Sequence, residues 1–481
     1  MRALAIDVGS SSVRTAVVDD HGVVSHVKQH RLTVRSPHPG EVELDPREIA
    51  SLSIELATRT LNEGGACDVV GITNQRATTI VFDPVTGEAV GPALSWQDLR
   101  TVLDCLVLQG EGLRLAPNQS ATKIRWLVNQ SGRSTRELRF ATIETWIAWH
   151  LSEGATFATD LSNASVNGLV NLAMDGWDER VLSALELDSV MLPRLVDTMG
   201  SFGVASALTG APPILAMVGD QPASLFGQSC VRRGAKITFG TGAMLDMVQG
   251  DEAPRSFSRL ASGCYPTVVR SRDAHTTWGL EGIILSAGAC VEWLLDLGLI
   301  STPSESEHLA NSVPSTDGVS FVPALSGLGT PQWDFGARGA FFGLTRGSSR
   351  AHLVRAVLEG IAQRGADLLD AAEQEIGATL SELRVDGGMS ANRFFVQRLA
   401  DFSGHPAAVS SEREATTRGA GLMALVSAGT LTLDDVEQLW SPAYVATPSL
   451  SEDERHSSRD QWLTTVKRVE RTIPELSAVS F

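Results

Sequence analysis

One pattern occurs twice in the chain and limits its fold more than any other: an apolar strand that runs into a turn of glycine and hydroxyl residues. The first strand, residues 3–6, leads into Asp-Val-Gly-Ser-Ser-Ser at 7–12 and resumes at 14–18. The second ends at Gly-Thr-Gly, residues 240–242, and resumes at 244–248. Glycine permits a sharp turn, and successive backbone N–H groups with hydroxyls beside them hold an anion. The repeated pattern predicts two α/β units that each begin with a phosphate-sized turn.

The length agrees with two units. A chain of 481 residues exceeds the size at which a single hydrophobic core stops growing, and its composition of 43% hydrophobic and 20% charged residues is that of a globular protein. We place the boundary between Phe226 and Gly234, which predicts domains at 1–228 and 229–481. A site between two such units is the default expectation, because ligand pockets form preferentially at domain interfaces.

The charge and the cysteines restrict the partners. A formal net charge of −17 opposes nucleic acid and anionic membrane surfaces, so a small metabolite is the expected ligand. The five scattered cysteines show no metal-binding spacing and predict free thiols in a reducing, cytoplasmic setting. Carboxylates interrupt the apolar stretch 279–300, which predicts a buried amphipathic helix and no membrane span. The oligomeric state stays open, a homodimer included.

Asp220 is the strongest catalytic candidate. It follows the apolar strand 214–218 and precedes a helical pattern at 221–228, so its carboxylate lies at a strand end. Phosphoryl transfer depends mainly on positioning, and a carboxylate there can take the proton of an attacking hydroxyl. The alternative is a helix N-cap aspartate, which is compatible with the same pattern.

Three further blocks complete the expected site. Asp7 can hold Mg²⁺ through water, Gly240-Thr241-Gly242 offers close backbone approach to phosphates, and residues 386–388 (Asp-Gly-Gly) open a helix against which a nucleoside can lie. Each block alone is compatible with an ordinary turn rich in serine or glycine. Their conjunction, in an order that builds a two-sided phosphate clamp, predicts a phosphoryl-transfer enzyme with ATP and Mg²⁺ as its cofactors.

That order of blocks resembles the FGGY carbohydrate kinases of the actin-like ATPase superfamily over about the whole chain. Residues 339–359 are similar to the second signature of the family, and residues 118–130 are similar to the first, with Asn118 as a departure at its opening position. The resemblance implies an α/β fold of two actin-like, ribonuclease H-like domains. Each would be a mixed sheet with flanking helices, and the two would surround a central cleft.

Within the family the chain is most similar to the glycerol kinase branch. The strings at 72–76 (Ile-Thr-Asn-Gln-Arg), 95–98 (Ser-Trp-Gln-Asp), 159–165 and 323–329 carry this likeness. It implies transfer of the γ-phosphate of ATP to a primary hydroxyl of a small polyol, with glycerol as the leading substrate. A ketopentose kinase, acting for example on xylulose, is the enzymatic alternative. A non-catalytic nucleotide-binding protein of the same superfamily is the remote one.

The resemblance also assigns residues. The chemistry of the side chains supports the polyol assignment independently. The Arg76 guanidinium can donate hydrogen bonds to two hydroxyl oxygens at once, and Trp96 offers a flat apolar wall. Taken singly, a surface ion pair for Arg76 and a core position for Trp96 are the plainer alternatives. The polyol would contact Arg76, Trp96, Asn118, Asp220 and Gln221, with Ala77 and Met244 as further walls. The nucleotide would contact Ser10, Ser11, Ser12, Arg14, Gly240, Thr241, Gly288, Glu292, Gly387, Gly388 and Asn392, and the metal would lie near Asp7 and Asp220.

Three positions depart from the glycerol kinase pattern. Ala77 stands where that branch carries a glutamate, Asn118 where it carries a tyrosine, and Met244 where it carries a phenylalanine. A lost buried acceptor penalises a glycerol hydroxyl by about 1–3 kcal/mol, whereas the smaller alanine makes room for a longer polyol or sugar. The Gly- and Arg-containing loop associated with fructose-bisphosphate inhibition is not apparent at 204–213, so we expect no such regulation.

Overall fold

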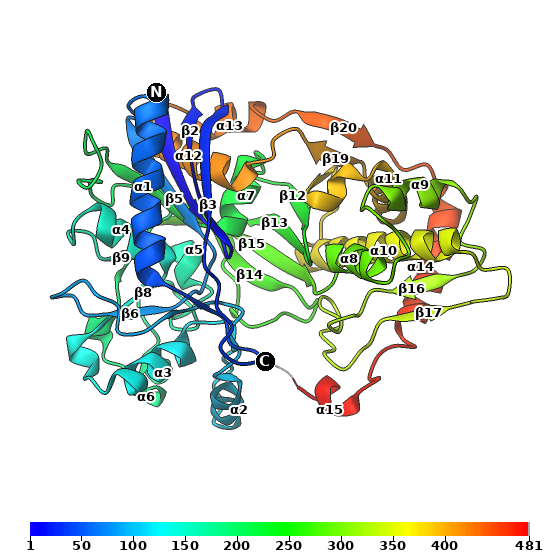
Figure 1. The fold of residues 1–481 in the computed structure, drawn as a ribbon, viewed down its shortest axis with the longest axis horizontal. Helices are drawn as coiled ribbons and strands as arrows, with labels where there is room; N and C mark the ends of the chain where they lie inside the picture. The colour runs from blue at the N-terminus through cyan, green and yellow to red at the C-terminus, as the bar shows by residue number, and fades with distance from the viewer. Residues whose placement is uncertain (480–481) are drawn as a thin grey trace.

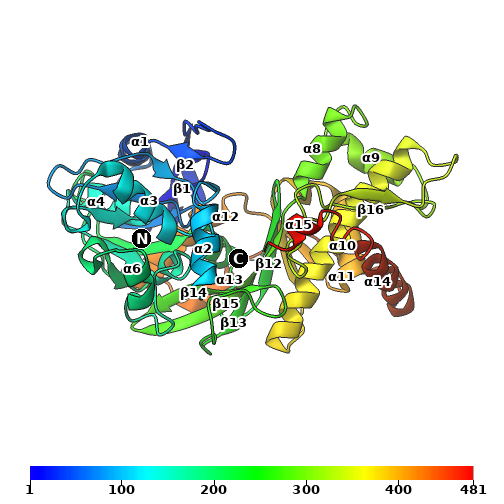
Figure 2. The ribbon, with the colours of Figure 1, turned by 90° about the horizontal axis from the view of Figure 1, so that it is seen from below.

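The computed structural model describes residues 1–479 and forms two α/β halves that lie side by side (Figures 1 and 2). Each half is built on one large sheet, and the predicted α/β class is confirmed. The five-stranded first sheet has the order β11-β5-β1-β2-β3, and the seven-stranded second sheet has the order β14-β15-β13-β12-β18-β19-β20. Their strands are β1 (Arg2–Val8), β2 (Ser12–Asp19), β3 (Val24–Arg31), β5 (Val69–Asn74), β11 (Ile214–Gly219), β12 (Ala235–Phe239), β13 (Ala243–Gly250), β14 (Tyr265–Arg272), β15 (His275–Ile284), β18 (Leu383–Asp386), β19 (Ala407–Ser410) and β20 (Pro442–Ala446).

The two sheets share one topology. In the first, β1, β2 and β3 form an antiparallel meander, and β5 and β11 continue it in parallel on the other side of β1. In the second, β12, β13 and β15 are the equivalent antiparallel strands, with β14 added on the outer side of β15, and β18 and β19 continue the sheet in parallel on the other side of β12. The two turns that the sequence pattern predicted occupy equivalent places, between β1 and β2 and between β12 and β13.

Helices cover both faces of the first sheet. Leu4 and Ile6 pack in one core cluster with α1 (Pro46–Gly64) and α4 (Ile143–Leu151), because alternate residues of a strand point to opposite faces. Ala3 and Ala5 face α12 (Ala415–Ser427), a helix that comes from the far end of the sequence (Figure 1). The predicted division at 228/229 stays a prediction, and α12 lies on the first sheet although its residues belong to the second half of the chain.

Helices α7 (Asp220–Gly227) and α12 cross at glycines, where no side chain separates their backbones. A Cβ on Gly227, the last residue of α7, would lie 1.8 Å from the Ala415 oxygen. A Cβ on Gly419 of α12 would lie 1.8 Å from the Ala223 oxygen. The two helices therefore pack backbone to backbone, which fixes α7 and the residues at its start relative to the second half.

The first half carries a large insertion between β5 and β11, with its own small core. Its first part contains β6 (Ile80–Phe82), β7 (Ala93–Leu94), α2 (Val102–Gly110), α3 (Ala121–Ser131) and β8 (Arg139–Ala141). Its second part contains β9 (Ala158–Asp160), α5 (Leu161–Ala164), α6 (Glu179–Ala184) and β10 (Arg194–Val196), while β4 (Glu43–Leu44) pairs with β7 from outside the insertion.

In the second half, α10 (Arg350–Ile376) packs against one face of the sheet, and its start is closed by a capping box of Ser349 and His352. The predicted helix at 279–300 is partly wrong, because residues 279–284 lie in β15 and only α8 (Gly288–Asp296) is helical. The apolar pattern of a buried strand with a neighbour on each side cannot be distinguished from that of a buried helix by periodicity alone. The remaining elements are α9 (Glu305–Asn311), β16 (Ser320–Val322), β17 (Ala340–Phe342), α11 (Arg393–Ser403), α13 (Leu433–Gln438), α14 (Glu452–Val466) and α15 (Pro474–Ser477). Within residues 1–479 no helix is long and apolar enough to cross a membrane.

Candidate active site

The carboxyl ends of three parallel strands of the first sheet meet at one edge. Val8 of β1, Asn74 of β5 and Gly219 of β11 are register neighbours. The residues just before or after them therefore lie close together, although they are far apart in the sequence. This edge brings Asp7, Arg76 and Asp220 into one group.

Asp220 begins α7 and faces Arg76. Its Oδ1 lies 3.5 Å from Arg76 Nε and accepts a hydrogen bond of 2.9 Å from the Gln221 backbone N–H. The N-cap of the helix is Gly219, so the N-cap alternative for Asp220 is wrong by one residue. Burial raises the pKa of Asp220 against the lowering effect of Arg76. Its side chain is still 30% exposed, so a small molecule can reach a carboxylate that is more basic than usual.

Arg76 joins the two halves. Its Nη2 contacts the carboxylate of Glu281 on β15, and only 10% of its side chain is exposed. The surface ion-pair alternative is therefore wrong, because this pair is buried. Among the described residues Arg76 Nη1 has no hydrogen-bond partner although it is shielded from solvent. A buried donor without a partner is costly, so this atom is suited to an incoming oxygen.

A row of charged side chains crosses the second sheet beneath this group. Glu281 of β15, Asp246 of β13 and Lys236 of β12 are register neighbours on the same face. The Lys236 ammonium is 0% exposed. It donates to Gln221 Oε1 and to Thr238 Oγ1 at 2.9 Å each, and it forms an ion pair with Asp246 Oδ2 at 2.9 Å. Sequence reasoning missed these three residues. The one available signal was a single Lys, Asp or Glu inside each of three largely apolar strands.

Two of the predicted polyol walls lie next to each other. The Ser120 hydroxyl donates to the Ala77 carbonyl at 3.1 Å, which ties the segment with Asn118 to the end of β5. Ala77 has a φ of +59°, in the left-handed region.

Trp96 is 40% exposed, so the core-aromatic alternative is wrong. Met244 is half-buried on β13, on the same strand face as Asp246.

The first phosphate-sized turn is closed by a hydrogen bond of 2.9 Å from the Gly9 N–H to the Ser12 carbonyl. Asp7 lies at its start, where Thr417 of α12 donates to Oδ2 at 3.1 Å and Arg14 Nη1 lies 3.4 Å away. Burial raises the pKa of Asp7 to about 6. Ser10 and Ser12 are half-buried and Ser11 is exposed, so these hydroxyls remain accessible at the edge of the sheet.

The second turn is tied to the start of α8. The Gly288 N–H donates to the Gly240 carbonyl at 2.9 Å, and the Ala287 N–H donates to the Thr241 carbonyl at 2.8 Å. A Cβ on Gly288 would lie 2.5 Å from the Gly240 oxygen, so the turn and the helix approach as closely as glycine allows. Glu292, on the same helix, is exposed.

The predicted nucleoside segment follows β18. Gly387 has a φ of +86°, and a Cβ there would lie 2.4 Å from the Phe239 oxygen, next to the second turn. Gly388 has no described atom within 4 Å of a Cβ position, so its backbone faces open space. Asn392 caps α11 by accepting from the Phe395 N–H at 2.9 Å, and it also donates to Ser306. Its side chain is therefore already engaged within the protein.

A buried polar network supports the strand ends from behind. Asn74 donates to Glu144 Oε2 at 3.2 Å and to Asn163 Oδ1 at 3.0 Å, and Asn163 donates to Asp160 Oδ1 at 2.7 Å. Ser162 Oγ accepts from the Gly219 N–H at 2.8 Å, directly before Asp220. The strings at 72–76 and 159–165 therefore form the support that positions the site.

The donor set fits a magnesium ion held mostly by a nucleotide. No group of three or more His, Cys, Asp or Glu side chains in residues 1–479 is arranged to hold a metal. The carboxylates of Asp7 and Asp220 lie at the same sheet edge, and the charge of Asp220 adds to the effect of burial in raising the pKa of Asp7. Mg²⁺ is usually bound by one or two carboxylates together with substrate phosphates and waters, which agrees with this set.

Comparison with known families decides the assignment. Residues 2–227 match the N-terminal domain of the FGGY family of carbohydrate kinases, and residues 235–428 match its C-terminal domain. The chain belongs to the FGGY family of carbohydrate kinases. The predicted family and enzyme class are confirmed: the protein is a phosphotransferase with an alcohol group as acceptor, and the non-catalytic alternative is set aside.

Relatives extend over nearly the whole chain. A glycerol kinase of Aromatoleum aromaticum is 39% identical, covering 97% of this chain and 98% of its own, and a glycerol kinase of Deinococcus radiodurans is 38% identical with 97% of both covered. The crystal structure of Plasmodium falciparum glycerol kinase with ADP matches with a TM-score of 0.91 at 28% identity, covering 100% and 99%. A Lactobacillus acidophilus xylulose kinase structure matches at 20% identity with a TM-score of 0.86, covering 99% of each chain, and shows the shared fold.

Proposed function

We propose that this FGGY kinase transfers the γ-phosphate of ATP to a primary hydroxyl of a small polyol, with glycerol as its leading acceptor. One observation carries the proposal: Asp220 and the partnerless Nη1 of buried Arg76 lie at the same sheet edge, with Trp96 exposed. A base and a forked donor beside an aromatic wall suit a molecule with adjacent hydroxyls and apolar C–H faces. The glycerol kinases among the relatives support the choice of glycerol.

The chain supplies the groups that the reaction needs at the acceptor. Asp220 orients the attacking hydroxyl and accepts its proton, and its raised pKa makes it a better base than an exposed aspartate. Arg76 holds the neighbouring hydroxyl oxygens. The Lys236 ammonium donates a hydrogen bond to the amide oxygen of Gln221, so the amide NH₂ group of Gln221 is left to donate to the polyol.

The nucleotide would lie across the two turns. Backbone N–H groups and hydroxyls at Ser10–Ser12 and at Thr241 would receive the phosphates, and the open backbone at Gly388 would receive the nucleoside. Asp7 and Asp220 would hold Mg²⁺, which neutralises phosphate charge when it is bound. Buried, unpaired cysteines and the net charge of −17 support a cytoplasmic enzyme that acts on small metabolites.

A kinase of a longer polyol or a ketopentose is the second candidate. The observation that favours it is Ala77, a short side chain that directly follows Arg76 in the sequence, at a position where glycerol kinases are expected to carry a carboxylate. Without that acceptor a glycerol hydroxyl loses a partner, and a longer substrate gains volume.

ADP release with Mg-ATP tests the proposal across glycerol, erythritol, pentitols, xylulose, ribulose and gluconate. We expect glycerol to stimulate ADP release, and the Asp220→Asn variant to abolish the stimulation. A response to xylulose or ribulose alone would replace glycerol by the second candidate. ADP release that none of these acceptors stimulates would refute the polyol and sugar assignment.

A further inference from the structure

Gln75 directly follows β5, at the edge where the ends of the parallel strands meet. Its side chain is 1% exposed, yet among residues 1–479 neither its amide oxygen nor its amide nitrogen has a hydrogen-bond partner. The backbone around it is fixed, because the Gln75 N–H donates to the Val8 carbonyl at 2.8 Å and the Gln75 carbonyl accepts from Asn74 Nδ2 at 2.9 Å. An amide that is shielded from water and unpaired is costly, so this position is suited to a ligand that supplies the partners.

The alternation of β5 decides on which face of the sheet Gln75 lies. Alternate residues of a strand point to opposite faces. A Cβ on Gly71 would meet the backbone oxygen of Ala420 in α12, so the face of Gly71 is the one that α12 covers. Gln75 follows Gly71 by four residues and therefore belongs to the same face. Asp7 lies on this face too, because Thr417 of α12 donates a hydrogen bond to its carboxylate.

The order of the strands, β11-β5-β1-β2, also orders the parts of the reaction. Asp220 follows β11, Gln75 follows β5, Asp7 lies in β1, and the turn at 9–12 joins β1 to β2. Asp220 begins α7, which packs against α12, so it lies on the same face as Gln75. Neighbouring strands are about 4.8 Å apart. The end of β5 therefore lies between the base for the acceptor and the turn expected to hold the phosphates, so the path of the transferred phosphoryl group crosses it.

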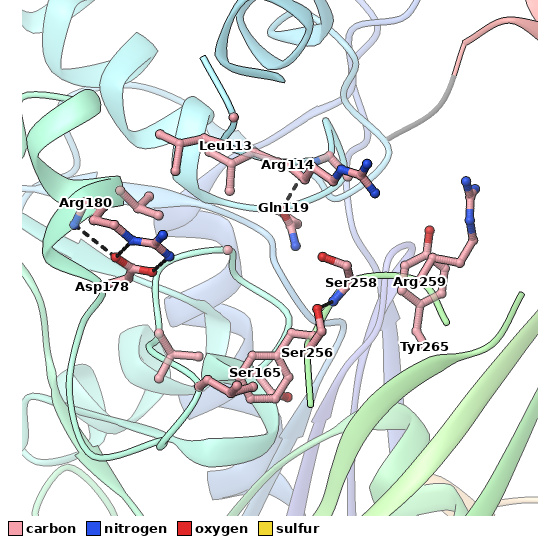
Figure 3. A pocket seen from close by; sticks show the side chains of 18 of the residues that line it. Leu113, Arg114, Gln119, Ser165, Asp178, Arg180, Ser256, Ser258, Arg259 and Tyr265 are labelled. Carbon is pink, nitrogen blue, oxygen red and sulfur yellow. Dashed lines mark hydrogen bonds and ion pairs between the residues drawn. The ribbon is translucent and has the colours of Figure 1, made fainter. Parts of the chain in front are cut away.

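The cavity of about 450 Å³ shown in Figure 3 does not lie on this path. Its walls come from the insertion, with Gln119 and Arg180, and from the second half, with Arg259 and Tyr265. Of the described residues that line it, none is expected to hold the acceptor, the nucleotide or the metal. The polar contacts of the transferred group therefore have to come from the strand ends.

We propose that Gln75 is a further catalytic residue, whose side-chain amide donates a hydrogen bond to the γ-phosphoryl group of ATP as this group is transferred to the acceptor. This inference rests on the proposed function for the placement of the nucleotide and the base, and it holds for any alcohol acceptor. In the step, the acceptor hydroxyl oxygen forms a bond to the γ-phosphorus, the bond from that phosphorus to ADP breaks, and the hydroxyl proton passes to Asp220. Gln75 keeps its own protons and stabilises the charge on the phosphoryl oxygens, as a fixed donor does in a site shielded from water.

A neutral amide suits this position better than a cation. Asp7 and Asp220 flank the end of β5, and a lysine or arginine between them would pair with their carboxylates. The amide of Gln75 offers two N–H donors and no charge, so the carboxylates stay available for the metal and for the proton of the acceptor. The next residue, Arg76, has its own partnerless Nη1. Arg76 thus serves the acceptor, and Gln75 serves the group that the acceptor receives.

Gln75→Met tests the role, because methionine keeps the length of the side chain and removes both polar atoms. We expect kcat to fall about 10²-fold, the usual effect of losing one fixed donor to a transition state. The melting temperature should stay the same or rise, because an unpaired buried amide is lost. Gln75→Asn, which keeps the amide but withdraws it by one methylene, should also lower kcat and serves if the methionine variant does not fold. Unchanged kcat in a folded variant would overturn the catalytic role.

Gln363→Met is the matched control. Gln363 is a buried glutamine of α10 whose amide is paired, because its Nε2 donates to Ser458 and its Oε1 accepts from Arg459. Its replacement should lower the melting temperature and leave kcat unchanged. The two variants should therefore show opposite patterns, which loss of a merely structural glutamine at 75 would not produce.

Nucleotide binding without an acceptor separates this inference from the proposed function. In calorimetry with Mg²⁺, the non-hydrolysable ATP analogue AMPPNP should bind Gln75→Met about tenfold more weakly than the wild type, because a hydrogen bond to a charged group is lost. ADP, which has no γ-phosphoryl group, should bind both proteins equally well. This result in an enzyme that phosphorylates no polyol would support the role of Gln75 and refute the proposed acceptor. An unchanged ratio of AMPPNP to ADP affinity would overturn the contact with the γ-phosphoryl group and leave the polyol kinase intact.

Discussion

The ammonium group of Lys236 donates a hydrogen bond to the amide oxygen of Gln221, with an Nζ–Oε1 distance of 2.9 Å. Lys236 belongs to the second sheet and Gln221 to the first turn of α7, so the bond joins the two halves at the predicted acceptor site. Burial opposes the charge of Lys236, yet Asp246 beside it raises its pKa, and the group stays protonated. A protonated lysine can only donate, which fixes the orientation of the Gln221 amide.

Replacement of Lys236 by methionine should therefore damage both acceptor binding and stability. We expect KM for the polyol to rise about tenfold, because Gln221 loses its orientation. Asp246 would remain buried without its cation, which costs about 3–5 kcal/mol in the free energy of unfolding. The double variant Lys236→Met/Asp246→Leu should recover most of the melting temperature but not the KM. A normal KM in the double variant would show that the lysine is structural only.

The Asp220→Asn variant should fold normally and lose turnover. Asparagine keeps the shape and can still accept the Gln221 N–H bond, but it cannot accept the proton of the acceptor. General-base catalysis contributes about 10²–10⁴-fold, so we expect kcat to fall by that factor while the nucleotide still binds. Steady-state kinetics and thermal melting measure the two effects. Near-normal kcat in a folded variant would exclude Asp220 as the base.

The helix crossing at Gly419 should tolerate no side chain. A Cβ there would lie 1.8 Å from the Ala223 oxygen, and backbone cannot move aside as a flexible side chain does. Gly419→Val should lower the free energy of unfolding by more than about 3 kcal/mol or abolish soluble expression, by overpacking α7 against α12. Gly110→Ala at the end of α2, where no described atom lies within 4 Å, is the control and should be neutral or slightly stabilising. Comparable melting of the two variants would contradict the close crossing.

The pair of buried carboxylates Glu144 and Asp160 should make stability depend on pH. Burial raises the pKa of both groups above their usual values, and Glu144 raises the pKa of Asp160 further. The folded state therefore binds more protons than the unfolded state at pH values between the ordinary and the raised pKa. Their contribution to stability is full at low pH and is lost as the pH rises through the raised pKa of the folded protein.

Asp160→Asn removes one of these titrations and keeps an acceptor for the Ser162 N–H. We expect the melting temperature of the wild type to fall more steeply from pH 4 to pH 7 than that of the variant. Melting curves across this range measure the difference. Parallel curves would mean that these carboxylates do not titrate differently on folding.

The turns of the site could be predicted because their chemistry is local. Gly9 with Ser10 to Ser12, and Gly240 with Thr241, indicate by composition alone a sharp turn lined by N–H groups and hydroxyls, and the structure places both between paired strands. Asp220 could be predicted at a strand end for the same reason. The apolar stretch 279–300 could not be assigned, because strand and helix bury such a run equally well.

Local sequence patterns predicted two α/β units, their phosphate-sized turns and the family to which the chain belongs, because each of these depends on residues close together in the chain. Long-range packing places Lys236, Asp246 and Glu281 beneath Arg76 and Gln221, and it brings α12 onto the first sheet. Strand register and helix crossing set these neighbours. They arise from packing between segments up to several hundred residues apart, and no local pattern encodes which face of a strand meets which partner.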